Sequence, residues 1–202
     1  MNSQPDPADI VESARRDPRL PPGQVLTDKW PVLHHGTVPA VDLATWDLVV
    51  DGRVTSPRRW TWKEFEALPR TRVHSDIHCV TRWSRYDNDW EGVSLRHVLQ
   101  LAAPAADARF AVIHAEHGFT TNLPLEELLQ DDVLLADLHD GKPLTPEHGW
   151  PLRLVVPRRY FWKSAKWIRR IELADRDQPG FWERNGYHND ADPWREERFS
   201  DW

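Results

Sequence analysis

The short stretch Ser75–Ser84 contains the residues with the clearest capacity for chemistry. It holds His78 and Cys79, and Cys79 is the only cysteine among the 202 residues. A single thiol forms no disulfide within its own chain, so Cys79 is a buried apolar residue, a nucleophile or a metal ligand. Composition alone favours the buried role. A nucleophilic thiol needs a histidine base, for which the candidates are His114 and His117.

A zinc site is the second alternative for this stretch, because imidazole and thiolate are the usual zinc ligands. His74, His78 and Cys79 supply these groups. Apolar and polar residues alternate over residues 72–80, which predicts a strand that ends near the cysteine. The alternation places Cys79 on the face opposite to both histidines, so the spacing is unfavourable for zinc.

A second informative stretch is rich in cations and runs from Glu147 to Trp167. A strongly apolar segment, Leu152–Val156, leads into a loop, and the basic side chains around it are Arg153, Arg158, Arg159, Lys163 and Lys166. Cations gathered at a strand end favour an anion, such as the phosphate of a cofactor. The alternative is a solvated loop whose cations pair with surface carboxylates.

The apolar periodicity predicts short helices and more numerous strands, and therefore an α+β fold with a mixed, largely antiparallel β core. The tight-turn signal Asp51-Gly52 predicts a hairpin between 46–50 and 53–54. Thr61 and Glu64 are spaced as a capping box. Further helices are predicted from Leu95 and from Leu125, and further strands are predicted at 110–115, 133–138, 152–156 and 167–173.

Composition excludes several classes of protein. The formal net charge of -6 and the isoelectric point near 5.9 argue against nucleic acid as a partner. No apolar run reaches the roughly 18 residues that a membrane span needs. Residues 1–29 are rich in proline and charge and predict a flexible arm, followed by one domain over 30–202 that includes an aromatic tail, 180–202. Because residues 1–6 show no export-signal pattern, we expect a cytoplasmic protein.

Several ordered motifs resemble the sulfite oxidase family of molybdopterin enzymes. They are His78–Ser84, Trp90–Leu95, His148–Pro157, Trp162–Ile168 and Ile171–Glu172. The resemblance extends from about residue 30 to the end of the chain. It implies the sulfite oxidase-type molybdopterin-binding fold, with molybdenum held by one pterin dithiolene and by the thiolate of Cys79. A soft thiolate suits such a sulfur-rich centre.

The resemblance also implies which residues bind the cofactor. In addition to Cys79, these are His34, His35, His114, His148, Arg153, Ser164, Ala165 and Lys166. One of the two adjacent N-terminal histidines is expected to face the pterin, because neighbouring side chains diverge. The register around His114 is affected by an insertion that follows Cys79.

The motif after the cysteine bears on the substrate. Sulfite oxidases carry arginines there that hold the anion, whereas this chain has Trp83 and Ser84. The loss of a charge-assisted clamp weakens sulfite binding. The pattern is more similar to the bacterial branch that includes the catalytic subunit of methionine-sulfoxide reductase. The expected catalytic residues are Cys79, Arg82 and Trp83.

The resemblance therefore implies a two-electron oxo-transfer oxidoreductase that acts on a small molecule of the sulfoxide or oxyanion type. We expect a separate electron-transfer partner, because no haem domain is evident in the sequence. The alternative is a molybdopterin-binding or partner-binding module of the same fold without turnover. A zinc or thiol hydrolase is a third hypothesis. The oligomeric state is left open by the sequence.

Overall fold

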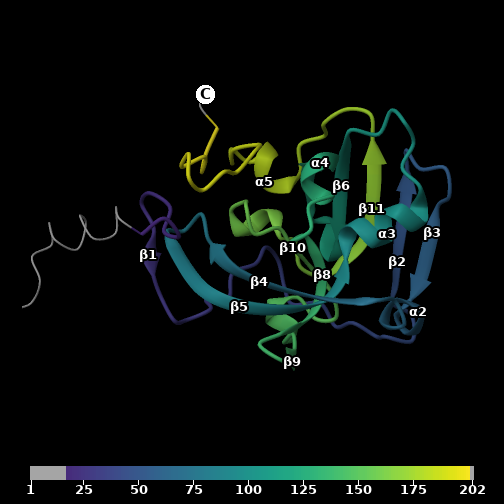
Figure 1. Ribbon diagram of the computed structural model, residues 1–202, viewed down its shortest axis with the longest axis horizontal. Helices are drawn as coiled ribbons and strands as arrows, with labels where there is room; N and C mark the ends of the chain where they lie inside the picture. The colour runs from purple at the N-terminus through teal and green to yellow at the C-terminus, as the bar shows by residue number, and fades with distance from the viewer. Residues whose placement is uncertain (1–16, 201–202) are drawn as a thin grey trace, which may run out of the picture.

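Two β-sheets form the framework of the computed structural model, which describes residues 17–200 (Figure 1). The strands of the first sheet are β1 (Val25–Leu26), β4 (Arg70–His78), β5 (Trp83–Ser94), β8 (Leu134–His139), β9 (Lys142–Pro143) and β10 (Arg153–Val155). The second sheet has the order β3 (Arg58–Thr61), β2 (Asp47–Gly52), β11 (Ile168–Ala174), β6 (Phe110–Ala115) and β7 (Thr120–Pro124). Long β5 joins β1, β4 and β8 within one curved sheet.

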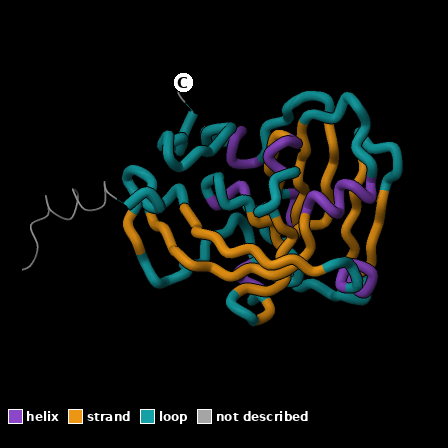
Figure 2. The backbone as a smooth tube through the Cα atoms, in the orientation of Figure 1, coloured by secondary structure: helices purple, strands orange, loops and turns teal. Residues whose placement is uncertain are grey.

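The helices are short compared with the longest strands (Figure 2). They are α2 (Trp62–Glu66), α3 (Leu95–Ala102), α4 (Leu125–Leu128) and α5 (Phe181–Arg184), with the 3-10 turns η1 (Glu116–Gly118), η2 (Pro146–His148) and η3 (Phe161–Lys163). Within residues 17–200 the strand pairs are antiparallel except for β1 with β5 and β2 with β11. The predicted α+β fold with a mixed, largely antiparallel core is confirmed.

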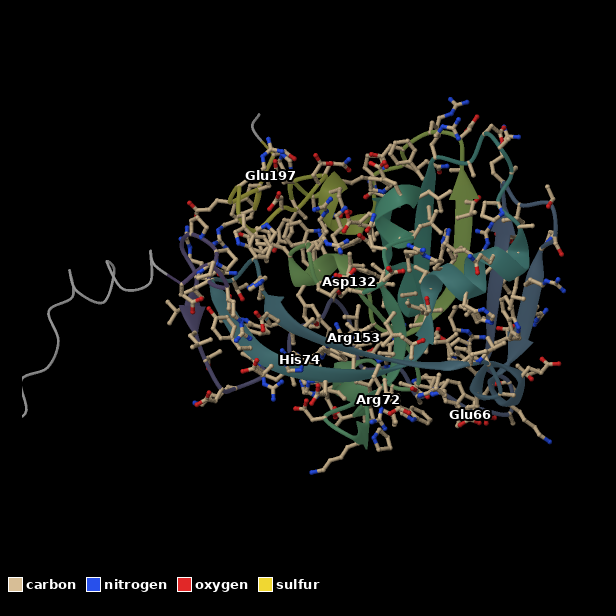
Figure 3. All side chains as sticks on the ribbon, viewed as in Figure 1. Glu66, Arg72, His74, Asp132, Arg153 and Glu197 are labelled. Carbon is tan, nitrogen blue, oxygen red and sulfur yellow. The ribbon has the colours of Figure 1, made fainter. Side chains whose placement is uncertain are left out.

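The main core forms where helix faces and inward strand positions meet. The predicted apolar face of α3 is fully buried, and its members are Leu95, Val98, Leu99 and Ala102. The capping box at the start of α2 is present, with Thr61 and Glu64 bonding to each other's backbone. Arg153 also lies in the interior, whereas Glu66 and Arg72 are exposed (Figure 3).

The predicted hairpin at Asp51-Gly52 is wrong. The strand β2 continues through Gly52, and its antiparallel partner is β3 rather than residues 53–54. Gly52 has a positive φ of 80°, and a Cβ there would lie 2.2 Å from the carbonyl oxygen of Leu173. The glycine is therefore required by the close approach of β11 and by its own backbone conformation. A tight turn has the same sequence signal.

The cysteine lies in the turn between β4 and β5. The N–H of Cys79 donates to the carbonyl of Trp83 (2.9 Å), and the N–H of Arg82 donates to the carbonyl of Cys79 (3.0 Å). Arg82 adopts a left-handed φ of 72° to close the turn. A register shift between Ser75 and Ile77 interrupts the predicted alternation. His78 and Cys79 are both buried, and the ring of His78 packs edge to face against Trp194, with the ring centroids 5.0 Å apart.

Both ends of the described chain pack near this turn. Residues 1–16 of the predicted flexible arm lie outside the described residues, and 17–29 run against the first sheet through β1, which pairs with β5. The C-terminal segment 180–200 lies above the same region (Figure 1). The boundaries at 29 and 180 stay predictions. Among residues 17–200, no helix is both long and apolar enough to cross a membrane.

Candidate active site

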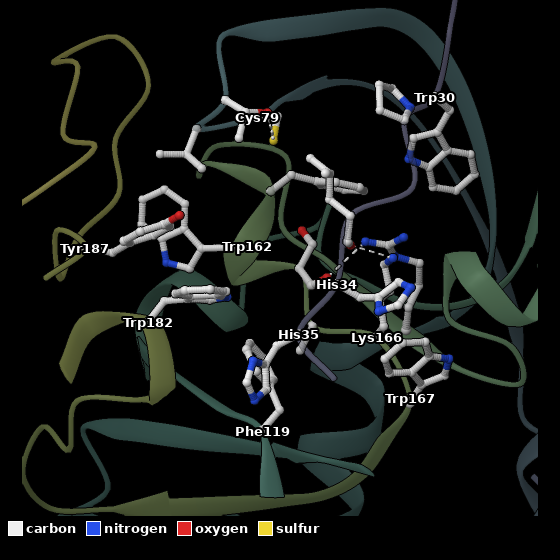
Figure 4. Close-up of a pocket in the computed structure, with 18 of the residues that line it drawn as sticks. Trp30, His34, His35, Cys79, Phe119, Trp162, Lys166, Trp167, Trp182 and Tyr187 are labelled. Carbon is white, nitrogen blue, oxygen red and sulfur yellow. Dashed lines mark hydrogen bonds between the residues drawn. The ribbon is translucent and has the colours of Figure 1, made fainter. Parts of the chain in front are cut away.

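A cavity of about 310 Å³ opens beside the turn between β4 and β5 (Figure 4). Its lining comes from segments that are far apart in the chain: residues 30–35, 79–83, 116–119, 161–167 and 182–187. The first and last of these segments lie outside the two sheets, and the sheets carry the others at strand ends. The cavity therefore forms only when the N-terminal and C-terminal segments have packed onto the domain.

The thiol of Cys79 lines this cavity, and both terminal segments hold its turn. Its Sγ lies 3.2 Å from the hydroxyl oxygen of Thr81. Gln24 donates to the Cys79 carbonyl (3.0 Å), and Arg198 donates to the carbonyl of Val80 (2.7 Å). The side chain is largely buried, and this burial raises the pKa of the thiol above its ordinary value. A bound cation at Sγ would be needed to keep such a thiol deprotonated at neutral pH.

One side of the cavity, here called the cationic wall, consists of Arg153, Ser164 and Lys166. Arg153 is 1% exposed and donates to the carbonyls of His148 (2.8 Å) and Ser164 (2.9 Å). The ring of Phe161 lies 4.2 Å from its guanidinium carbon. Burial lowers the pKa of Arg153 to about 9, so the guanidinium remains charged at neutral pH.

Lys166 has a similar environment on the same wall. Its ammonium donates to the carbonyls of Leu33 (2.8 Å) and Glu147 (2.6 Å). Burial first, and then the charge of Arg153, lower the pKa of Lys166 to about 7. Within residues 17–200, neither cation of the cationic wall forms an ion pair with a carboxylate.

The opposite side, here called the aromatic wall, consists of Trp162, Trp182 and Tyr187. The ring of Tyr187 stacks on Trp182, with centroids 4.8 Å apart, and meets Trp162 edge to face at 4.9 Å. In the view of Figure 4 these rings gather on one side, Lys166 and Trp167 lie on the other, and the sulfur of Cys79 lies between. Trp182 and Tyr187 are not among the predicted site residues; the density of aromatic residues after Gly180 was the signal available in the sequence.

The structure brings most of the predicted site residues together. Those that line the cavity are His34, His35, Cys79, Trp83, Arg153, Ser164, Ala165 and Lys166. The backbone at Ala165 is engaged in the fold, since its carbonyl accepts from Leu154 (2.8 Å). The hydroxyl of Ser164 accepts from the N–H of Val156 (2.9 Å), which fixes the start of the loop after β10.

Three predicted residues do not line the cavity. The side chain of Arg82 is exposed at the outside of its turn. His114 lies on β6 and pairs with Glu172 of the neighbouring strand, with 2.9 Å between Nε2 and Oε2. The ring of His148 stacks on Trp30, with the ring centroids 3.8 Å apart. The carbonyl of His148 accepts a hydrogen bond from Arg153 of the cationic wall.

The histidines of the zinc hypothesis have other partners. His74 lies between the carboxylates of Asp87 and Asp89 at the surface, and the Nδ1 of His78 lies 2.9 Å from the hydroxyl of Ser84. Neither histidine lines the cavity that Cys79 lines. In the described part of the chain, no group of three or more His, Cys, Asp or Glu side chains is arranged to hold a metal ion.

Comparison with known proteins identifies the family. Residues 35–182 match the family described as "Oxidoreductase molybdopterin binding domain". "Uncharacterized oxidoreductase YuiH" of Bacillus subtilis is 50% identical over 183 residues, which cover 90% of this chain and 92% of that protein. "Protein-methionine-sulfoxide reductase catalytic subunit MsrP" of Campylobacter jejuni is 26% identical over 68% of this chain and 52% of its own length.

The solved structures support the same fold. The sulfane dehydrogenase SoxCD from Paracoccus pantotrophus superposes with a TM-score of 0.67 at 23% identity, over 76% of this chain and 43% of that one. The chain thus spans most of YuiH and about half or less of the other two proteins. The chain belongs to the oxidoreductase molybdopterin binding domain family, and is a molybdenum-cofactor-dependent oxidoreductase of the sulfite oxidase type, as its motifs predict.

Proposed function

We propose that this protein catalyses two-electron oxo transfer on a small organic sulfoxide, with Cys79 as the protein ligand of molybdenum. The observation that carries the proposal is the arrangement of the cavity. The only thiol of the chain lies between a wall of aromatic rings and two cations that pair with no carboxylate of residues 17–200.

The residues present are suited to a molybdopterin. A thiolate is the ligand type preferred by a sulfur-coordinated transition metal, and a metal ion offsets the burial that raises the pKa of Cys79. The cations of the cationic wall are suited to the cofactor's phosphate, because guanidinium and ammonium groups form charge-assisted hydrogen bonds to phosphate oxygens. When bound, the cofactor supplies the redox couple and the oxo-transfer chemistry.

The backbone near Gly149 brings the two cations together. Gly149 has a φ of 115°, and a Cβ there would lie 3.1 Å from the Cβ atoms of both Arg153 and Lys166. A larger residue would push these side chains apart. His34 and His35 close the cavity from the N-terminal segment, and Arg153 and Lys166 would orient the anionic end of the cofactor.

The lining favours a neutral substrate over an anion. The lining residues next to Cys79 in the chain are Val80, Thr81 and Trp83, and Arg82 is exposed outside the cavity. The cations that line the cavity are Arg153 and Lys166, which the cofactor would occupy. A sulfoxide presents one polar oxygen and two carbon substituents, and these substituents pack favourably on aromatic faces. One relative, MsrP of Campylobacter jejuni, is the catalytic subunit of a protein-methionine-sulfoxide reductase, which supports this substrate class.

The alternative proposal is a cofactor-binding module without turnover. It shares the thiolate and the cationic wall and differs only in whether a substrate exchanges electrons with the bound metal. We further propose that electrons come from a separate protein and that the protein is cytoplasmic. Fractionation of cells that express a tagged full-length chain tests the location.

The test of the proposed function is chemical analysis of protein made in a host that synthesises the cofactor. We expect molybdenum and pterin in equal amounts, and oxidation of reduced methyl viologen when methionine sulfoxide is added. Zinc, or the absence of both metal and pterin, contradicts the proposed cofactor. A molybdenum protein that no sulfoxide reoxidises supports the module without turnover.

A further inference from the structure

A buried ion pair lies beneath the aromatic wall. The side chains of Lys163 and Glu183 are 0% and 2% exposed, and Nζ lies 2.6 Å from Oε1. The same ammonium donates to the carbonyl (2.9 Å) and to the side-chain oxygen (3.2 Å) of Asn122 on β7. The pair thus links η3, α5 and the edge of the second sheet.

Glu183 also holds an indole of the cavity. Its Oε1 accepts from the Nε1 of Trp162 (3.0 Å) and from the hydroxyl of Thr121 (3.2 Å), in addition to Lys163. Trp162 precedes Lys163 in the chain, and Trp182 precedes Glu183. Both tryptophans line the cavity, so one carboxylate is bonded to one of these indoles and adjacent in sequence to the other.

The C-terminal segment is pressed closely against β7 at this point. A Cβ on Gly180 would lie 2.5 Å from the carbonyl oxygen of Thr120 and 2.7 Å from Oε2 of Glu183. The N–H of Gly180 donates to the side-chain oxygen of Asn122 (3.2 Å). Only glycine allows this approach without a shift of the backbone, and the approach delivers Glu183 to Lys163.

Stability alone is a weak reason for such a pair. Removing two charges from water costs more than most buried pairs return, and apolar residues of similar volume often stabilise a fold as well or better. An ion pair does, however, fix an orientation, since its hydrogen bonds are directional. We therefore expect the ion pair to fix the orientation of its neighbours, and these neighbours are the rings of the aromatic wall.

We infer that Glu183 is a positioning residue, which fixes the indole of Trp162 and holds Trp182 at the cavity, so that the C-terminal segment is part of the substrate side of the site. Only the kinetic readout of this inference rests on the proposed function. The orientation of Trp162 is measurable without substrate or cofactor turnover.

Two paired variants isolate the hydrogen bond to the indole. Lys163→Met with Glu183→Gln removes both charges and keeps a carbonyl acceptor for Trp162, whereas Lys163→Met with Glu183→Leu removes the acceptor as well. In protein labelled with 5-fluorotryptophan, the ¹⁹F resonance of Trp162 is assigned by Trp162→Phe. We expect this resonance to keep its chemical shift in the Gln pair and to move or broaden in the Leu pair. A ¹⁹F resonance of Trp162 with the same position and the same width in both pairs would overturn the inference.

The kinetic readout uses holoenzyme with methionine sulfoxide as the probe and reduced methyl viologen as the electron donor. In the Leu pair we expect KM to rise about tenfold, as for a lost aromatic contact, with kcat per molybdenum changed less. The Gln pair should stay near the wild-type KM. A matched control is Arg70→Met with Asp137→Leu, which removes a part-buried pair between β4 and β8 away from the cavity lining.

A further variant tests the inference if Lys163→Met with Glu183→Leu does not fold. Trp162→Phe keeps an aromatic ring and the ion pair but loses the indole N–H, so it should raise KM similarly. An unchanged KM in Trp162→Phe contradicts the positioning role. If wild-type holoenzyme reduces no sulfoxide, the proposed function fails, while the ¹⁹F measurement still decides the role of Glu183.

Discussion

Two lysines of the same loop, Lys163 and Lys166, have opposite electrostatic surroundings. Lys163 is fully buried and has a carboxylate partner, Glu183, at 2.6 Å. Lys166 lies on the cationic wall and donates only to backbone carbonyls, as does Arg153 nearby. Within residues 17–200, Lys163 is neutralised by a carboxylate and Lys166 is not, so the charge of Lys166 is available for a ligand.

The two walls of the cavity therefore have different tasks. The cationic wall is electrostatically incomplete, which is expected of a site that receives an anionic cofactor. The aromatic wall carries no charge of its own: the indole N–H of Trp162 donates to Glu183, and Trp182 stacks on Tyr187. Changes on the first wall should alter cofactor content, and changes on the second should alter substrate use.

The largest effect on activity is expected at Cys79, the proposed metal ligand, which lies between the two walls. Cys79→Ser should lower oxo-transfer activity by more than the roughly 100-fold that outer-shell changes cost at metal sites. The substitution is small, so the fold should be retained. Activity per mole of protein and circular dichroism check this, with Thr55→Val, an exposed residue outside the cavity lining, as the control. Activity within tenfold of wild type would contradict the ligand role.

Reversing the charge on the cationic wall should remove cofactor from folded protein. Lys166→Glu places a carboxylate where an anion is proposed to bind, and we expect a loss of about 10- to 100-fold in cofactor affinity from one lost charge-assisted contact. Pterin fluorescence after cofactor release measures the content. The matched control is Lys63→Glu on the exposed surface of α2. Equal pterin content in Lys166→Glu and Lys63→Glu would contradict the proposal that the cationic wall binds the cofactor.

The lowered pKa of Lys166 predicts opposite pH dependences for folding and for cofactor binding. Its pKa is about 7 in the folded protein without cofactor, below the roughly 10.4 of an unfolded lysine, so the unfolded chain binds more protons between these values. The free energy of unfolding of the cofactor-free protein should therefore rise as pH rises from about 7 to about 10.

Cofactor affinity should fall over the same pH range, because the anion binds the ammonium form. The limit for one linked proton is about tenfold per pH unit. Urea denaturation and pterin titration at several pH values measure the two trends. Lys166→Arg keeps its charge and should flatten both. Parallel trends in the wild-type protein would contradict the assignment to Lys166.

On the aromatic wall, Trp182→Ala should leave the molybdenum content unchanged and raise KM for methionine sulfoxide by about tenfold through the lost ring contact. Steady-state kinetics of metal-normalised holoenzyme check this. A fall in molybdenum content with an unchanged KM would assign Trp182 to the cofactor side instead.

The smallest effect is expected at Arg82. Its side chain is exposed outside the cavity, and exposed charges contribute little at a distance. Arg82→Ala should change KM by less than about twofold, since solvent and salt screen an exposed charge outside the cavity. A large rise in KM, measured in the same assay, would restore the substrate role that its place in the sequence motif predicts.

Local signals in the sequence predicted much of the fold. The capping box at Thr61 and the apolar face of α3 depend on neighbouring residues, and the structure has both. The predicted Asp51-Gly52 hairpin was wrong because the glycine is required by its close contact with β11, a strand that lies far away in the sequence. The bulge near Ser75 was missed for a similar reason. The residue pattern of β4 does not show how that strand is aligned with its partner β5.

The residues of the candidate site likewise fall into those that sequence motifs predicted and those that only the tertiary structure brings to the cavity. Arg153, Ser164 and Lys166 lie in two neighbouring motifs within the stretch from Glu147 to Trp167, and all three line the cavity. Trp182 and Tyr187 reach the cavity only because the C-terminal segment packs across β7, and the Lys163–Glu183 contact joins residues of separate segments. Periodicity and motif spacing do not encode such contacts. His114 shows the converse, because its strand position directs it to Glu172 rather than to the cavity.

The most direct test of the account is X-ray absorption at the molybdenum edge of wild-type holoenzyme and of Cys79→Ser reconstituted with the same cofactor. We predict one sulfur neighbour fewer around molybdenum in the variant, because Cys79 supplies a thiolate that serine does not. The same number of sulfur neighbours in both proteins would contradict the central claim that Cys79 binds the metal.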